Sequence, residues 1–465
     1  MNEIEIAYQE TLDYLYSFID YSLTRNFRYT ADKFNLDRVN ELLGYLGNPH
    51  QQYPIVHLAG TKGKGSTAAM IASVLKASGH RVGFYTSPHL MDYTERIQVD
   101  GQPISHAEMV SLVEEMKPAI HKVKEITTFE ITTALGFLYF FRKGIDMAVV
   151  EVGLGGRLDA TNVVNPLVSV ITSLSYDHTN VLGDTLSQIA TEKAGIIKPG
   201  RPVVISPQKE EARKVVVKIA MERDSKLIEV GEDYLFAADT HNLDGQTLLV
   251  WSAEEQPLVD EFIQSGGHSF WKPTRLRIPL LGYHQVENAA TAYAALQVIK
   301  NEGFRITEAS VREGFQTVFW PGRFEILRRF PPVILDSAHN PDSALKLRLT
   351  LDDYLPDKKV IMVFGASEDK DVRGMFAVLL PRISSLITTS SVHPRAMDAQ
   401  ALAELAHQFG RPAQAVVPVE DALALALKKA GDEMAVLVTG SLFVAAAARE
   451  IWHKVYSPLR TFETI

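Results

Sequence analysis

The stretch that decides the fold reads His57-Leu58-Ala59-Gly60-Thr61-Lys62-Gly63-Lys64-Gly65-Ser66-Thr67. An apolar, extended run from Ile55 leads into it, and residues Thr67 to Ser78 have the composition of a helix. A strand, a glycine-rich loop with a lysine and a helix N-terminus, in this order, present backbone N–H groups to phosphates. A glycine-rich turn with a solvated lysine is the simpler alternative, but the coincidence of these features favours a polyphosphate-binding loop.

The amino-acid sequence of this loop departs from the common P-loop pattern. That pattern has a glycine five places before Gly63 and a serine or threonine directly after Lys64, whereas this chain has Leu58 and Gly65 at those positions. The departure indicates a particular subfamily rather than nucleotide-binding proteins in general.

Composition restricts the class of partner. The chain has 465 residues, no cysteine, a formal net charge of −9 at pH 7 and a pI of about 5.9. This length predicts two or three domains, and we take two as the working number. The acidic balance argues against a nucleic-acid surface, so we expect small-molecule partners. Without cysteine, disulfides, thiolate catalysis, zinc–thiolate sites and Cys-ligated iron–sulfur clusters are excluded, which leaves hard-cation and phosphate chemistry.

No segment is typical of a secretory signal or of a membrane span. Residues Met1 to Glu5 carry acid where a signal peptide carries base, and apolar runs such as Leu135 to Phe141 are too short to cross a bilayer. We therefore expect a soluble cytoplasmic protein without a membrane partner, and we take a monomer as the working oligomeric state.

Apolar runs alternate with amphipathic helical stretches over most of the chain, a pattern that predicts an α/β fold. The stretch from Asp233 to Pro279 has an apolar run at Thr247 to Trp251 and no helical period, so we expect a small antiparallel extension there. Residues 1–322 are thus predicted to form a P-loop-type domain with a mainly parallel sheet. Its expected strands are Ile55–Ala59, Val82–Thr86, Met147–Val152, Leu167–Thr172 and Val203–Ser206.

A turn at Trp320-Pro321-Gly322-Arg323 separates this domain from a second alternation of strands and helices. The pattern predicts a smaller Rossmann-like domain over residues 323–465. Its expected strands are Val333–Asp336, Val360–Phe364, Ser385–Thr389 and Val436–Thr439.

Polar side chains follow several of the expected strands, where open α/β sheets bind their ligands. Glu151 ends one strand and is a candidate metal ligand, because an unpaired buried acid with only a structural role is costly. His178 follows the next strand and could complete a second metal site, although a lone histidine is more often an ordinary hydrogen-bonded one. Lys193, near the end of a helix that begins around Thr185 with Gly195 as its C-cap, looks by itself like a solvated lysine.

The loop Asp336-Ser337-Ala338-His339-Asn340-Pro341 places an acid, a histidine and an amide just past a strand of the second domain. Such a loop can hold sugar hydroxyls and an incoming substrate. A capped connector explains Asn340 and Pro341 but leaves Asp336 and His339 without a role.

Together these motifs resemble folylpolyglutamate synthase and dihydrofolate synthase, a family of ATP-dependent amide-forming enzymes related to the Mur ligases. The extra Gly65 between Lys64 and Ser66 is similar to the folate branch, not the peptidoglycan branch. The likeness covers nearly the whole chain. It rests on Gly60 to Ser66, Tyr85 to His89, Glu151 to Asn162, Asp177-His178, Glu192 to Gly195, Pro321 to Arg323, Asp336 to Pro341 and Asp369 to Asp371.

The resemblance implies that a substrate carboxylate takes the γ-phosphoryl group of ATP and that the α-amine of L-glutamate attacks the resulting acyl phosphate. The implied substrates are ATP, L-glutamate and a folate or dihydropteroate, with Mg²⁺ expected at two sites. Lys64 would reach the β- and γ-oxygens of ATP. The other implied ATP contacts are Gly60, Thr61, Lys62, Gly63, Gly65, Ser66, Asn288, Arg323 and Asp336.

The resemblance also implies the remaining site residues. Lys193 matches a lysine that carbon dioxide converts to a carbamate in these ligases, and an unmodified Lys193 is the alternative. With Lys64, His178 and Glu151 it forms the expected catalytic set. Magnesium is expected on Ser66, Ser87, Glu151, His178 and Lys193, the pterin on Thr127, Phe129, Asp159 and Ala160, and glutamate on His339 and Ser441.

Lys62 departs from the family, because many members of the folate branch have asparagine there. It adds a positive charge beside the phosphates, which could modify nucleotide affinity without changing the reaction. Phe129 could equally be a core residue. Two other functions stay open: a Mur-like ligase for another carboxylate acceptor, and a nucleotide-dependent switch without chemistry, which would not need Glu151, His178 and Lys193 together.

Overall fold

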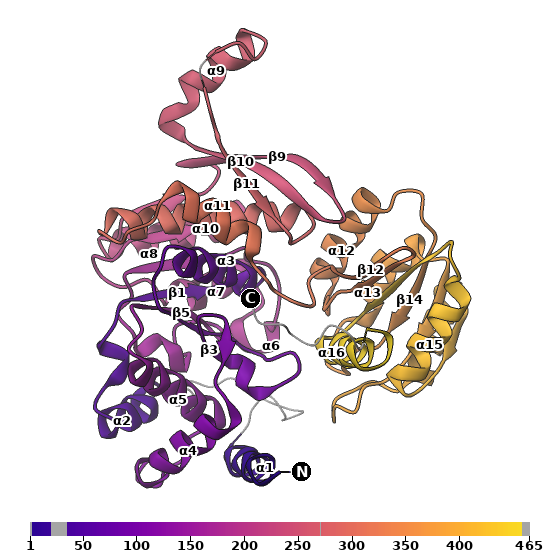
Figure 1. Ribbon diagram of the computed structural model, residues 1–465, viewed down its shortest axis with the longest axis horizontal. Helices are drawn as coiled ribbons and strands as arrows, with labels where there is room; N and C mark the ends of the chain where they lie inside the picture. Colours follow the sequence, from indigo (N-terminus) through magenta and orange to yellow (C-terminus); the bar gives the residue numbers. More distant parts are fainter. Residues whose placement is uncertain (1, 20–34, 270, 458–465) are drawn as a thin grey trace. The chain divides into compact units, whose positions relative to one another are not determined.

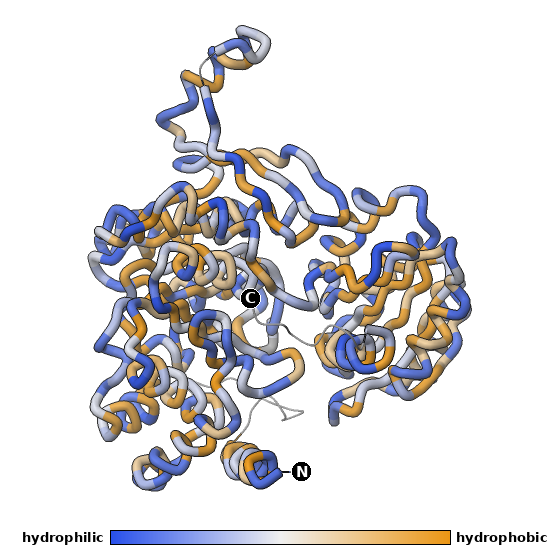
Figure 2. The backbone as a smooth tube through the Cα atoms, viewed as in Figure 1, coloured by the Kyte–Doolittle hydropathy of each residue, from blue (hydrophilic) through white to orange (hydrophobic). Residues whose placement is uncertain are grey.

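The computed structural model describes residues 2–19, 35–269 and 271–457 (Figure 1). The chain forms two compact units. The first comprises Met1–Thr240, Thr247–Pro279 and Gln285–Val318, and the second comprises His241–Gln246, Leu280–His284 and Phe319–Ile465. Apolar segments concentrate in the interior of each unit, and polar segments lie outside (Figure 2).

The first unit is built on an eight-stranded sheet in the order β4-β3-β2-β5-β1-β6-β7-β8. From β2 to β8 all neighbouring strands are parallel, whereas β3 pairs antiparallel with both β2 and β4. This confirms the predicted α/β class with a mainly parallel sheet. The strands are β1 (Ile55–Ala59), β2 (Val82–Tyr85), β3 (Ile97–Val99), β4 (Gln102–Pro103), β5 (Met147–Glu151), β6 (Val168–Ile171), β7 (Val203–Ile205) and β8 (Leu227–Glu229).

Helices cover both faces of this sheet, with α3 on one side of β1 and β5 and α5 on the other (Figure 1). The described helices before residue 319 are α1 (Glu3–Tyr16), α2 (Asp37–Tyr45), α3 (Lys64–Ala77), α4 (His106–Ile120), α5 (Thr128–Lys143), α6 (Thr179–Leu182), α7 (Leu186–Ala194), α8 (Glu210–Glu222), α9 (Gln256–Gln264), α10 (Tyr283–Asn301) and α11 (Glu308–Thr317). Short 3₁₀ turns lie at Pro49–Gln51 (η1), Tyr93–Arg96 (η2), Ala160–Val163 (η3) and Ala253–Glu255 (η4).

Helices α3 and α11 pack unusually closely. A Cβ added to Gly314 of α11 would lie 2.4 Å from the Cα atom of Val74 in α3. The Ser73 hydroxyl donates a hydrogen bond to the Gly314 carbonyl at 2.7 Å. Only a glycine allows this approach, so α11 is fixed against the helix that begins at the glycine-rich loop.

The expectation of no helix between Asp233 and Pro279 is wrong. Three strands, β9 (Tyr234–Asn242), β10 (Gly245–Ser252) and β11 (Thr274–Ile278), form a sheet in the order β11-β10-β9, and α9 lies in the connection from β10 to β11. Among the nine residues of α9, only Val259 is buried. Its apolar residues Leu258, Val259, Phe262 and Ile263 do recur at helical spacing, but over nine residues only, and this short period was missed.

The second unit has a six-stranded sheet in the order β12-β13-β17-β14-β15-β16, parallel except for the antiparallel pair β12–β13. Two hydrophobic clusters cover its opposite faces, because alternate residues of each strand point to different sides. The strands are β12 (Glu325–Arg329), β13 (Pro332–Leu335), β14 (Val360–Phe364), β15 (Ser385–Thr388), β16 (Ala413–Ala415) and β17 (Ala435–Thr439). The helices are α12 (Pro341–Tyr354), α13 (Val372–Leu379), α14 (Ala399–Gln408), α15 (Val419–Ala430) and α16 (Leu442–Ile451), with a 3₁₀ turn at Leu380–Arg382 (η5) and a π-helical turn at Trp452–Tyr456 (η6).

The helix after the glycine-rich loop begins three residues earlier than predicted. It starts at Lys64 rather than Thr67, with Gly63 in the left-handed N-cap position. The loop lysine therefore belongs to the first helical turn, where N–H groups have no intrahelical acceptor. None of the helices in the described parts of the chain combines the length and apolar character needed to cross a membrane.

Candidate active site

Four adjacent strands bring the predicted residues of the first unit to one edge of the sheet. In the order β2-β5-β1-β6, Ser87 follows β2, Glu151 ends β5, the loop from Gly60 follows β1, and His178 comes after β6. These strands are parallel, so their carboxyl ends share one edge. The topology therefore explains why residues spread over more than a hundred positions can serve one site.

Two glycines of the loop after β1 are required by close contacts. Gly63 has φ +88°, and a Cβ there would lie 2.2 Å from Oδ1 of the buried Asn288. A Cβ on Gly60 would lie 1.8 Å from the Thr172 hydroxyl oxygen. No other residue fits either position. At both glycines the surface of the loop is therefore formed by backbone atoms and not by a side chain.

The loop is fastened to the segment that follows β6. The N–H groups of Thr61 and Lys62 donate to the Ser173 carbonyl at 3.0 and 3.1 Å, and the Lys62 ammonium lies 2.9 Å from Oδ2 of Asp177. Lys64 turns back to its own loop, where Nζ donates to the Gly60 carbonyl at 3.1 Å. The unusual Lys62 is therefore part of a half-buried ion pair that holds two loops of the site together.

The first turn of α3 supplies the donors for an anion. By position, the N–H groups of Lys64, Gly65 and Ser66 have no acceptor within the helix, and the positive end of the helix dipole lies there. The Ser66 side chain is buried in this turn. This arrangement binds phosphate groups readily.

Glu151 is a buried carboxylate at the end of β5, only 5 % exposed. Its Oε2 accepts a hydrogen bond from the hydroxyl of Thr86, which is also buried. Thr86 was not singled out from the sequence, although it directly precedes the half-buried Ser87 in the same motif. The hydroxyl fixes the orientation of the carboxylate, as is typical of hydrogen bonds to carboxylates that bind a metal ion.

His178 lies on the solvent side of the same edge. It caps the short helix α6 with φ +50°, and its side chain is 45 % exposed. Its Nε2 is 3.9 Å from Oδ1 of Asp177, the residue whose other oxygen is bound by Lys62. Asp177 therefore connects the histidine to the glycine-rich loop, a role that the sequence did not reveal.

Lys193 is buried, contrary to the simple expectation of a solvated helix lysine; its exposed fraction is 5 %. Burial lowers the pKa of its ammonium to about 7, and the positive charges of Lys64 and Lys62 act in the same direction. Asp177 and Asp159 oppose this shift without cancelling it. The amine is therefore substantially neutral near pH 7, whereas an ordinary lysine is charged.

A scaffold of motif residues holds this lysine in place. Arg157 forms an ion pair with Glu192 at 2.8 Å, and the Asn162 amide donates to the carbonyls of Arg157 and Gly195 at 2.9 and 3.3 Å. Gly195 is the C-cap of α7, as expected, and its φ of −57° is right-handed. It is glycine because a Cβ would lie 2.4 Å from Cβ of Arg157. The loop after β5 and the end of α7 thus pack backbone to backbone.

The residues expected to hold a pterin gather near Gly153. A Cβ on this glycine would lie 2.5 Å from the Phe129 ring and 3.2 Å from Oδ2 of Asp159. Burial raises the pKa of Asp159, while N–H and hydroxyl donors around it oppose the shift. Ala160 lies next to it in η3, and the Thr127 hydroxyl caps α5 by accepting from the Glu130 N–H. The structure therefore places an aromatic ring and a carboxylate side by side.

The second unit gathers its predicted residues after β13 and β17. Both oxygens of the Asp336 carboxylate accept backbone N–H groups at 2.8 Å, from Phe324 and Ala338. Burial raises the pKa of Asp336, and those bonds together with the Arg323 charge oppose the shift. Ser441 caps α16 just past the parallel neighbour strand β17. The other two predicted side chains, of Arg323 and His339, bond respectively to the hydroxyl and the carbonyl of Ser337.

The donor set fits magnesium rather than a metal held only by protein. Across residues 2–19, 35–269 and 271–457, no cluster of three or more histidine, aspartate or glutamate side chains is arranged to hold a metal ion. Magnesium commonly uses one or two carboxylates together with substrate phosphates and water. The buried Glu151 beside the phosphate-binding turn meets this requirement.

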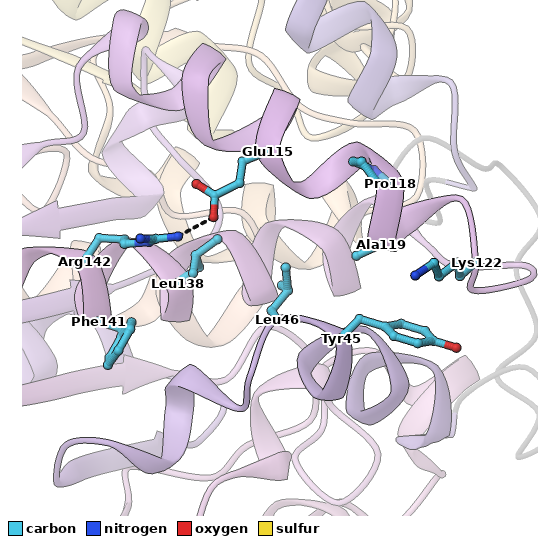
Figure 3. A pocket seen from close by; sticks show the side chains of 9 residues that line it. All are labelled: Tyr45, Leu46, Glu115, Pro118, Ala119, Lys122, Leu138, Phe141 and Arg142. Carbon is cyan, nitrogen blue, oxygen red and sulfur yellow. Dashed lines mark hydrogen bonds and ion pairs between the residues drawn. The ribbon is translucent and has the colours of Figure 1, made fainter.

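A surface groove of about 360 Å³ lies between α2, α4 and α5 (Figure 3). Its charged lining groups already have neighbours, because Arg142 pairs with Glu115 and the Lys122 ammonium lies 4.8 Å from the centre of the Tyr45 ring. None of the residues predicted to bind a substrate lines it. The candidate active site is therefore the edge formed by β2, β5, β1 and β6.

Two domain families of the Mur ligases match this chain. The Mur ligase middle domain matches residues 58–296, and the glutamate ligase domain of Mur ligases matches residues 322–442. The bifunctional dihydrofolate synthase/folylpolyglutamate synthase of Bacillus subtilis is 35 % identical over 430 residues, which cover 90 % of this chain and 95 % of that protein.

A relative from Haloferax volcanii, named as a probable bifunctional folylpolyglutamate synthase/dihydropteroate synthase, is 34 % identical over 96 % of this chain. The chain spans about half of that longer relative, 52 % of its length. Among solved structures, the Mycobacterium tuberculosis folylpolyglutamate synthase complexed with ADP superposes with a TM-score of 0.83 and 32 % identity, covering 97 % of this chain and 99 % of that one. Similarity of this extent shows that the chain belongs to the folylpolyglutamate synthase and dihydrofolate synthase family of Mur ligases.

Proposed function

We propose that this chain is an ATP-dependent ligase that adds L-glutamate to a folate, and that dihydropteroate is a second acceptor. The observation that carries the proposal is the edge of four parallel strands. It brings a phosphate-binding turn, a buried carboxylate and a lysine of lowered pKa into one unit. A nucleotide switch without chemistry needs the first of these features but not the other two.

The main obstacle to this reaction is the repulsion between two anions, the acceptor carboxylate and ATP. In the proposed sequence, a carboxylate oxygen attacks the γ-phosphorus and ADP leaves. The glutamate nitrogen then attacks the carbonyl carbon, phosphate leaves, and the ammonium-derived proton is lost to solvent. The N–H groups at the start of α3 and the Lys64 ammonium lower the cost of bringing the anions together.

Magnesium, when bound with ATP, supplies positive charge beside the transferred phosphoryl group. We propose Glu151, Ser66 and Ser87 as the residues that hold it, because they provide hard oxygen donors at neighbouring strand ends. His178 and Lys193 complete the proposed second site. The half-exposed position of His178 leaves its ring accessible.

We propose that Lys193 carries a carbamate in the working enzyme. Carbamylation requires a neutral amine, and a pKa of about 7 makes about half of the amines neutral at pH 7. The modification would turn the buried amine into an anion, which the charges of Lys64 and Lys62 favour and those of Asp177 and Asp159 oppose.

For the second unit, we propose that Asp336 and Arg323 contact the nucleotide and that His339 and Ser441 contact glutamate. Their support is that the loops after β13 and β17 are joined, since the Gly440 N–H donates to the Ala338 carbonyl at 3.1 Å. In the first unit, Asn288 is the proposed adenine contact beside Gly63, and Thr127, Phe129, Asp159 and Ala160 form the proposed pterin site.

The deciding experiment incubates purified protein with ATP, Mg²⁺ and labelled L-glutamate, with tetrahydrofolate, dihydropteroate or no acceptor. The expected result is ADP release and an acceptor heavier by one or more glutamyl groups, identified by mass spectrometry. ADP release that is independent of every acceptor would overturn the proposal in favour of a switch. Cytoplasmic location and a monomeric state are further expectations, tested by cell fractionation and by sedimentation.

A further inference from the structure

We propose that His57 and Thr161 are positioning residues that aim the Asp159 carboxylate at the acceptor. The inference deepens the proposed function, on which it rests, because Asp159 is the proposed contact to the pterin. Neither His57 nor Thr161 belongs to the set of site residues inferred from the sequence. Both are fully buried.

Three side chains form a continuous chain of hydrogen bonds from β1 to the acceptor site. Nε2 of His57 lies 2.8 Å from Oγ1 of Thr161, which lies 2.5 Å from Oδ1 of Asp159. The Thr161 N–H donates to the same oxygen at 3.0 Å. One threonine therefore holds one carboxylate oxygen with two donors.

The direction of the protons follows from the chemistry of the groups. The Thr161 hydroxyl donates its proton to Oδ1 of Asp159. The hydroxyl oxygen must then accept from His57, whose Nε2 carries the proton. Its Nδ1 is buried and has no hydrogen-bond partner among the described residues. Burial lowers the pKa of His57 to about 3, so the neutral ring is the relevant form.

A histidine at position 57 lowers the stability of the fold relative to an apolar residue. The neighbouring β1 residues Val56 and Leu58 are buried and apolar, and an apolar residue at position 57 would leave no unpaired ring nitrogen. A buried polar atom without a partner costs free energy. The contribution of His57 is therefore its hydrogen bond to Thr161, not its packing.

Locking Oδ1 determines where Oδ2 points. Oδ2 accepts the Leu154 N–H at 2.8 Å and faces the Phe129 ring across Gly153. A carboxylate has about four acceptor positions; the hydrogen bonds to Thr161 and Leu154 use three of them, and the Gly153 N–H also donates to the group. An N–H donor of a planar heterocycle stacked on Phe129 would share Oδ2, the oxygen that lies on the side of that ring. Without Thr161 the carboxylate could rotate away from that donor.

The test compares matched variants that keep or remove single hydrogen bonds. Thr161→Val removes the hydroxyl at nearly constant volume, whereas Thr161→Ser keeps it. His57→Leu removes the donor, whereas His57→Gln keeps a donor nitrogen at a similar reach. Each variant is assayed for the KM of dihydropteroate, the KM of ATP and kcat, and dihydropteroate binding is measured by calorimetry without ATP.

We expect Thr161→Val to raise the KM and the Kd of dihydropteroate about tenfold, with the KM of ATP and kcat within about twofold. Thr161→Ser should restore the acceptor constants, and His57→Leu should raise them where His57→Gln does not. If Thr161→Val does not fold, the His57 pair gives the same readout.

Acceptor constants that stay within twofold of the wild type in both Thr161→Val and His57→Leu overturn the inference, as does an equal rise in the KM of ATP. A wild-type protein that neither turns over nor binds dihydropteroate or tetrahydrofolate would instead overturn the proposed function. The two failures are therefore distinguishable in one set of measurements.

Discussion

The burial of the Lys193 ammonium leads to a quantitative prediction for how the stability of the folded chain depends on pH. Its pKa falls from 10.5 to about 7 on folding, so between these values the unfolded chain binds more protons than the folded one. The stability of the wild type must therefore rise with pH across this window. Linkage gives a destabilisation of about 4 kcal/mol at pH 7, which shrinks to about 2 kcal/mol at pH 9.

Lys193→Met replaces the amine with an apolar side chain of similar length and removes this penalty. We expect the variant to be inactive but more stable than the wild type. The difference between their free energies of unfolding should narrow by about 2 kcal/mol between pH 7 and pH 9. The assay is urea unfolding followed by circular dichroism, in buffer depleted of carbon dioxide so that no carbamate forms.

Lys218→Met is the matched control, because the Lys218 side chain on α8 is 76 % exposed. Its stability relative to the wild type should not change with pH in this range. A gap between wild type and Lys193→Met that stays constant from pH 7 to pH 9, or a variant less stable than the wild type at pH 7, would refute the reasoning.

Three further predictions test the candidate site. Glu151→Gln should abolish acceptor-dependent ADP release while the circular dichroism spectrum is unchanged, because it weakens an ion ligand at constant volume; unimpaired turnover in a folded variant would exclude that role. Gly63→Ala should weaken ADP binding at least tenfold by calorimetry, since its Cβ would meet Asn288 at 2.2 Å, whereas Gly79→Ala, at φ +86° with open space around it, should bind normally. Lys62→Met and Asp177→Asn should each raise the KM of ATP severalfold, and the double variant should be no worse than either, because both break the same pair at 2.9 Å; additive effects would contradict this.

Long apolar strands were the features most readily predicted from sequence. The strands β1 and β14 have the predicted bounds, because every residue of each is buried and the sequence is apolar throughout except at His57. Short edge strands such as β4 (Gln102–Pro103) carry exposed residues and give no such signal. The helix α9 was missed for a different reason, because its helical period extends over only nine residues.

The location of the candidate site residues at strand ends was predictable from the sequence, whereas their surroundings were not. The glycine-rich loop and Glu151 follow from local patterns, because each adjoins an apolar strand. The burial of Lys193 depends on the docking of the loop after β5 through Gly195 and Arg157, a contact between distant segments. The bonds from Lys62 to Asp177 and from Thr86 to Glu151 also join separate strand ends, which no local pattern specifies.

The tight fit of Gly314 against Val74 has a mechanical consequence. Helix α11 ends at Thr317, where the chain leaves the first unit, and its anchor is the helix whose first turn carries the phosphate-binding groups. The segment that leaves the first unit after α11 therefore starts from a helix that is fixed against α3. A bulkier residue at position 314 would push α11 away from α3. It would shift the start of that segment without touching any reacting atom.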